Sequence, residues 1–138
     1  MPAYWLMKSE PAVFPWERLL KDGAAGWDGV RNHLAKRNLM SMKLGDLAFF
    51  YHSNVGREIV GIMRITKTAF PDPSDETGRF VQVGVEPVAA LKTPVTLLQI
   101  KADPQLAKMA LVTQSRLSVQ PVTPAEWKHI CKLGGVKV

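Results

Sequence analysis

Three polar side chains, those of Lys8, Ser9 and Glu10, directly follow the apolar run "YWLM" near the start of the chain. An ammonium group donates hydrogen bonds, a hydroxyl donates and accepts them, and a carboxylate accepts them or carries protons. On strict strand alternation Lys8 and Glu10 share one face and Ser9 the other, so all three serve one site only if the strand breaks before the following proline. Otherwise we expect Glu10 to be structural and to pair with Arg31 or Arg116.

The same combination recurs in the stretches "WDGVRN", "FFYHS" and "SRLSVQPV", where apolar or aromatic elements end in polar or basic residues. If several strand ends meet at one rim, these groups converge on one pocket. Aromatic rings can stack there on a planar ligand, Ser and Asn can bond its edge, and Arg and Lys can hold a phosphate. This chemistry can hold a nucleobase that has been flipped out of a strand. We expect Trp27 at this pocket, and Trp5, Phe49 and Trp127 in the core.

Familiar catalytic and metal-binding patterns are missing from the sequence. It contains no GxGxxG, GxxxxGK[ST], HExxH or GxSxG motif, so the dinucleotide-fold, P-loop, zinc-protease and hydrolase-elbow classes have no support. His33 and His129 are expected to be ordinary histidines, whereas His52 shares the polar strand end of "FFYHS". The single Cys131 is expected on a helix, packed at a surface, and not as a ligand. We therefore expect neither a metal nor a cofactor.

The charge of the chain favours a polyanionic partner. Eighteen Lys and Arg against twelve Asp and Glu give a net charge of +6, and the isoelectric point is near 9.7. The 138 residues are most simply one domain, residues 1–138, with an ordinary globular composition of 46% hydrophobic residues. No apolar run approaches the ~20 residues that span a bilayer. We expect a cytoplasmic monomer that binds no membrane.

Short strands and helices alternate along the chain. The patterns predict strands over 4–9, 47–53, 58–70, 79–91 and 117–122, with a turn at 54–57 that joins the second and third as a hairpin. They predict helices over 15–23, 32–42 and 123–135. Asn32 is the expected N-cap of the second helix. The third begins with Thr123 as cap and Glu126 closing a capping box, and Gly134 is expected to end it.

These elements predict an α+β protein, a small mixed barrel or curled sheet with peripheral helices. Five blocks in order, "YWLMKSEP", "WDGVRN", "MKLGDLAFFYHS", "VGIMRI" and "SRLSVQPV", make the chain resemble an EVE domain of the PUA-like superfamily. The resemblance implies a PUA-like fold, a twisted and mostly antiparallel β-barrel with short flanking helices, related in shape to PUA, ASCH and YTH domains. It also implies a pocket that recognises a modified base in DNA or RNA, with modified cytosine as the expected class.

The resemblance carries the pocket over to residues in four of these blocks. They are Lys8, Ser9, Glu10, Trp27, Val30, Arg31, Asn32, Tyr51, His52, Ser53, Arg116, Leu117 and Ser118. Two positions depart from the family pattern. His33-Leu34 stands where an aromatic and a polar residue are more usual, and Gly84 stands where an acidic residue is common.

Two function classes follow from the sequence. The first, which we favour, is a non-catalytic module that reads a modified nucleobase. The second is a hydrolase acting on a modified base or nucleoside, as in some ASCH-like relatives, with the Lys-Ser-Glu cluster supplying nucleophile and proton carrier. The hydrolase would need an additional buried base near Ser9, and none is evident from the sequence.

Overall fold

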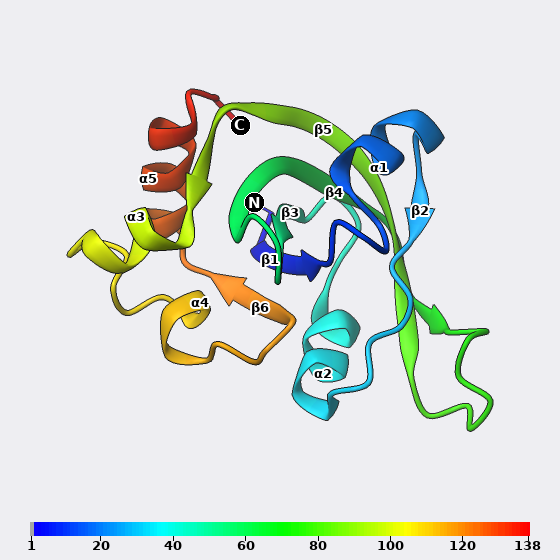
Figure 1. Ribbon diagram of the computed structural model, residues 1–138. Coiled ribbons are helices and arrows are strands. Elements are labelled where there is room, and N and C mark those ends of the chain that lie inside the picture. Colours follow the sequence, from blue (N-terminus) through cyan, green and yellow to red (C-terminus); the bar gives the residue numbers. More distant parts are fainter. Residues whose placement is uncertain (1) are drawn as a thin grey trace.

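The computed structural model describes residues 2–138, which form one six-stranded sheet and five helices (Figure 1). The strands are β1 (Tyr4–Ser9), β2 (Ala25–Gly26), β3 (Leu47–His52), β4 (Glu58–Pro71), β5 (Val81–Thr96) and β6 (Val119–Val122). The helices are α1 (Trp16–Asp22), α2 (His33–Ser41), α3 (Leu97–Ala102), α4 (Ala110–Thr113) and α5 (Pro124–Gly134).

The sheet has the order β2-β5-β4-β3-β1-β6. Neighbouring strands are antiparallel except β1 and β3, which run parallel. The pairing of β4 with β5 shifts register at four places, and such bulges bend strands, so both follow long curves in Figure 1. Within residues 2–138 the edge strands β2 and β6 do not pair with each other. The predicted α+β class and mostly antiparallel sheet are confirmed, but closure into a barrel is not shown.

Helices cover both faces of the sheet, because successive strand residues point to opposite sides. Phe50 lies in a buried cluster with residues of α1 and α2, whereas Phe49 lies in a second cluster with residues of α3, α4 and α5. The expected core positions of Trp5, Phe49 and Trp127 are confirmed by their burial. Trp127 of α5 stacks on Phe49 with ring centroids 3.9 Å apart. An aromatic pair of this kind adds ~0.5–1.5 kcal/mol beyond the area that it buries.

Most of the predicted elements form near their predicted bounds. The turn at 54–57 joins β3 to β4 as an antiparallel hairpin, as expected. Asn32 caps α2 by accepting a hydrogen bond from the Ala35 backbone at 2.9 Å, which confirms the predicted N-cap. The capping box of Thr123 and Glu126 at the start of α5 is also confirmed. α5 ends at Gly134, as predicted, and Gly135, with φ of 73°, takes the left-handed cap conformation.

Three elements were not predicted, namely β2, α3 and α4, and β5 extends beyond residue 91 to Thr96. α3 begins with a capping box in which Thr96 and Gln99 satisfy each other's backbone N–H groups. This Thr-x-x-Gln signal is readable in the sequence. β2 and α4, by contrast, have two and four residues, too few for a periodic pattern.

Two paired glycines let β2 approach β5 and thereby position Trp27. Gly26 lies opposite Gly84 in the sheet. A Cβ atom at Gly26 would lie 2.2 Å from the Gln82 side chain, and one at Gly84 would lie 2.8 Å from Cβ of Lys67. The Trp27 backbone N–H then donates to a β5 carbonyl at 2.8 Å. Gly84 therefore occupies a position where this structure has no room for a side chain.

Candidate nucleic-acid site

The end of β1 meets two segments that are distant in the sequence. Parallel pairing with β3 places Lys8 opposite Tyr51 and Ser9 opposite His52. The Ser53 backbone N–H donates to the Ser9 carbonyl at 2.9 Å. On the other side, the Lys8 backbone N–H donates at 2.9 Å to the carbonyl of Ser118, just before β6. The backbone hydrogen bonds therefore bring the blocks "FFYHS" and "SRLSVQPV" beside the end of β1, whereas the prediction was that their side chains share one pocket.

Two contacts fix the orientation of the Lys8 side chain. Its Nζ donates to the Ser115 carbonyl at 2.7 Å and lies 5.9 Å from the centroid of the Tyr51 ring. Burial lowers the pKa of Lys8 from its ordinary value, because a charged ammonium is less well solvated there. Burial likewise raises the pKa of Tyr51 beneath it, against the opposing field of Arg57.

A cavity of about 380 Å³, called here the β1 cavity, opens beside Lys8. Its lining residues are Lys8, Ser9, Val13, Phe14, Arg18, Gly26, Trp27 and Asp28. Trp27 has 6% of its surface exposed, and its ring meets Phe14 and Phe50 edge-on at centroid distances of 6.2 and 5.3 Å. The Ser9 hydroxyl donates to the Phe14 carbonyl at 2.6 Å, which fixes the turn after β1. Trp27 is therefore both a core residue and part of the cavity wall.

A second hollow of about 340 Å³, called here the α2 groove, lies between the start of α2 and the segment before β6. Its lining residues are Asn32, Leu34, Gln114, Ser115, Arg116 and Leu117. The β1 cavity thus contains Lys8, Ser9 and Trp27 of the predicted set, and the α2 groove contains Asn32, Arg116 and Leu117. The two hollows are neighbours, because the Lys8 side chain runs from the first to a backbone carbonyl in the wall of the second.

Seven predicted residues line neither hollow. They are Glu10, Val30, Arg31, Tyr51, His52, Ser53 and Ser118. Val30 is buried in the core, and Ser53 and Ser118 bond to β1 through their backbones. His52 accepts a hydrogen bond from the Trp16 backbone at 3.1 Å and so holds the start of α1. Burial lowers the pKa of His52, against the opposing fields of Glu17 and Glu58, which favours the neutral ring that accepts this bond.

The expected ion pair of Glu10 is wrong. Arg31 pairs instead with Asp72 at 3.1 Å, and within residues 2–138 neither Glu10 nor Arg116 has an ion-pair partner. Glu10 is exposed, and its backbone carbonyl accepts hydrogen bonds from Val13 and Phe14. The strand ends at Ser9, so the alternation that separates Lys8 from Ser9 stops there and both line one cavity.

Sequence reasoning missed Val13, Phe14, Arg18 and Asp28 in the wall of the β1 cavity. Asp28 had a readable signal, since it follows Trp27 in "WDG" and a carboxylate can accept a hydrogen bond from the amino group of cytosine. Val13, Phe14 and Arg18 had none, because their places in the wall depend on how the segment after β1 turns back.

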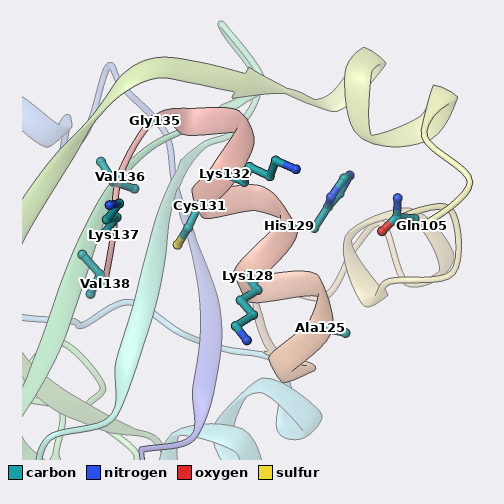
Figure 2. A pocket seen from close by; sticks show the side chains of 10 residues that line it. All are labelled: Gln105, Ala125, Lys128, His129, Cys131, Lys132, Gly135, Val136, Lys137 and Val138. Carbon is teal, nitrogen blue, oxygen red and sulfur yellow. The ribbon is translucent and has the colours of Figure 1, made fainter.

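A larger hollow, about 870 Å³, lies elsewhere, beside α5 and the C-terminal residues 135–138 (Figure 2). Its lining contains the lysines Lys128, Lys132 and Lys137 but no Phe, Tyr or Trp side chain that could stack on a base. Cys131, predicted at a surface, is 5% exposed here, and burial raises its pKa to about 11. The size of this hollow therefore does not make it the base site.

Two further features bear on the predicted partners. Within residues 2–138, no group of three or more His, Cys, Asp or Glu side chains gathers where it could hold a metal ion. The helices in this part of the chain are also too short or too polar to cross a membrane.

Comparisons with known proteins agree with this architecture. A Rhodopseudomonas palustris protein solved by NMR is 56% identical, with a TM-score of 0.91 over 96% of this chain and 93% of its own. The human THYN1 protein, solved in complex with 5-methylcytosine-containing DNA, is 34% identical, with a TM-score of 0.89 over 99% of both chains. The YTH domain of Zygosaccharomyces rouxii MRB1 shares the fold alone, at 18% identity and a TM-score of 0.62 over 99% of this chain and 88% of its own. The model of the EVE domain matches residues 3–133, and this chain belongs to that family.

Proposed function

We propose that this chain binds a single modified nucleobase, a modified cytosine carried in DNA or RNA, in the β1 cavity and leaves it chemically unchanged. The lining of that cavity carries the proposal. It combines the rings of Trp27 and Phe14 with two cations, Lys8 and Arg18, and one carboxylate, Asp28. Its volume of about 380 Å³ falls within the ~300–1,000 Å³ of small-molecule sites.

The chemistry of the wall matches the edge of cytosine. Cytosine offers an amino group as donor and ring acceptors beside it. The Asp28 carboxylate can accept from the amino group, and the Lys8 ammonium can donate to a ring acceptor. Val13, 75% exposed, offers an aliphatic surface to a methyl group on the base. Burying one such carbon contributes ~0.8 kcal/mol, about fourfold in affinity.

Family membership and charge support the same proposal. The human THYN1 protein, a member of similar fold, has been solved with DNA that contains 5-methylcytosine. The net charge of +6 favours attraction to either nucleic acid.

The contacts of Lys8 and Ser9 do not favour the hydrolase alternative, since the Lys8 Nζ donates to the Ser115 carbonyl and not to Ser9. A serine nucleophile must give its proton to a general base, but the Ser9 hydroxyl donates to the Phe14 carbonyl at 2.6 Å, which cannot take the proton. Glu10 lies outside the lining of the cavity. The geometry therefore favours binding over hydrolysis.

The direct test is a binding panel of labelled nine-nucleotide single strands, as DNA and as RNA, with one central cytosine or modified cytosine. Fluorescence anisotropy at two salt concentrations separates attraction to the backbone from recognition of the base. We expect at least about fourfold tighter binding of one modified base at both concentrations. Equal affinity for every strand would refute the proposal, and a change in product mass after incubation would favour the hydrolase.

A charge-matched pair of variants tests the role of Asp28. Removal of a negative charge from the surface should raise affinity for nucleic acid, and we expect this of Glu76→Ala, on an exposed loop. Asp28→Ala removes the same charge but should weaken binding of the modified strand, by about tenfold, because the acceptor for the amino group is lost. If both variants bind more tightly, Asp28 does not contact the base.

A further inference from the structure

We infer that the α2 groove holds the phosphate that flanks the bound base on one side, so that the strand leaves the β1 cavity across Lys8. This assignment rests on the proposed function, and it adds a second subsite with a different chemistry. The ligand of the α2 groove is a backbone phosphate with its sugar, and that of the β1 cavity is a base.

Continuity between the two hollows is the first support. The Lys8 side chain borders the β1 cavity, and its Nζ donates to Ser115, which lines the α2 groove. The segment 27–32 makes a second connection, because Trp27 lines the cavity and Asn32 lines the groove. In this segment, the Gly29 backbone N–H donates a hydrogen bond to the Asp72 carboxylate at 2.8 Å, which fixes the position of the segment. A strand with its base in the cavity therefore has a fixed wall to follow.

The chemistry of the groove suits a phosphate. Its six lining residues include no Asp or Glu, so no side chain in the lining repels an anion. Arg116 is exposed and has no ion-pair partner within residues 2–138. The side-chain oxygen of Asn32 accepts the hydrogen bond that caps α2, so its side-chain N–H groups remain available as donors. Leu34, 44% exposed, gives the sugar an apolar contact.

The other two arginines near the β1 cavity, Arg18 and Arg31, already have ion-pair partners. Arg31 pairs with Asp72 and also donates to the Ser74 hydroxyl at 3.0 Å. Arg18, in the cavity wall, pairs with Asp22 at 2.9 Å. Arg116 is therefore the guanidinium best placed to take a new anionic partner next to the cavity.

The test pairs a protein variant with a change in the ligand. The ligand is a nine-nucleotide DNA strand with one 5-methylcytosine, in which the phosphate 5′ or 3′ of that base is replaced by an uncharged methylphosphonate. Arg116→Gln is compared with Lys128→Gln, which removes one positive charge on α5. We expect Arg116→Gln to weaken binding of the unmodified-backbone strand by about three- to tenfold and to reduce the salt slope by about 0.7. Lys128→Gln should change both quantities much less.

The methylphosphonate strands decide whether the contact is local. One of the two methylphosphonates should weaken binding of the native protein as much as Arg116→Gln weakens binding of the ordinary strand. On that methylphosphonate strand, Arg116→Gln should cause no further loss of affinity. If each methylphosphonate lowers the affinity of the native protein and of Arg116→Gln by the same factor, Arg116 contacts neither phosphate and attracts the strand only through long-range charge. That result would overturn the inference. Failure of the proposed function looks different, because the native protein would then not distinguish 5-methylcytosine from cytosine in the ordinary strand.

Discussion

The carboxylate of Asp72 accepts a hydrogen bond from the backbone N–H of Gly29 at 2.8 Å, across 43 positions of sequence. The same side chain is fully buried and also binds Arg31 and both the backbone and hydroxyl of Ser74. One carboxylate thus joins the β4–β5 connection to the segment that begins with Trp27. Asp72 is a positioning residue for the wall of the β1 cavity.

Asp72→Asn should loosen this wall. The amide replaces one acceptor oxygen by a donor that faces other donors, so the free energy of unfolding should fall by about 2–3 kcal/mol. Affinity for the modified strand should also fall, because the segment around Gly29 becomes less ordered. Chemical denaturation and anisotropy measure the two effects. Asp75→Asn is the control, since Asp75 orders the same connection through Thr77 and Phe80 but bonds nothing in segment 27–31. Equal losses of affinity in the two variants would remove Asp72 from the positioning role.

Acid should act through the same carboxylate. Burial opposes its ionisation, but hydrogen bonds from Ser74, Gly29 and Arg31 together hold the pKa of Asp72 below its ordinary value of 3.8. The stability that it contributes is therefore present above about pH 4 and is lost as the pH falls through the lower, folded-state pKa. In denaturation experiments from neutral to acid pH, the gap in stability between the native protein and Asp72→Asn should narrow below about pH 4. A constant gap would contradict this.

Trp27 should affect both stability and binding, because it is a core residue as well as part of the cavity wall. Trp27→Leu should cost about 3–5 kcal/mol of stability and weaken binding of the modified base roughly ten- to a hundredfold. Trp27→Phe should keep an aromatic face, so much of the affinity should remain despite a lower melting temperature. Similar affinities of the folded Leu and Phe variants would show that the base does not stack on this ring.

Gly61 of β4 makes room for the indole of Trp16. A Cβ atom at Gly61 would lie 2.5 Å from that ring, which is itself 4% exposed. Gly61→Ala should therefore lower the free energy of unfolding by about 1–3 kcal/mol through overpacking. In a Trp16→Leu background the same substitution should cost less, since the clash is gone. Additive losses in the double variant would mean that the strain arises elsewhere.

Cys131 should react slowly with thiol reagents. Its pKa is raised to about 11 by burial, from 9.0 for a free thiol, so near pH 8 its thiolate fraction is about a hundredfold lower. Alkylation by iodoacetamide, followed by mass spectrometry, should be at least that much slower than for a small thiol. Denaturant should restore the ordinary rate. Rapid alkylation of the folded protein would show that the α5 helix opens readily.

The sequence predicted the parts of this fold that depend on local patterns. Strand alternation and glycine turns defined β1, β3 and β4, and the Thr123 capping box defined the start of α5. The polar ends of β1 and β3 also indicated a shared edge, which the parallel pairing of Ser9 with His52 bears out.

Only the tertiary structure decided which polar groups face a hollow. Arg31 was a predicted site residue like Lys8, but Asp72, 41 residues from Arg31, takes up the guanidinium. Phe14 and Arg18 reach the β1 cavity because the segment after β1 turns back, with the Ser9 hydroxyl bonded to the Phe14 carbonyl. Such contacts join residues distant in sequence and depend on packing, register and competing ion pairs. A local pattern determines which element forms, but the partner of a side chain is determined by what the whole chain brings beside it.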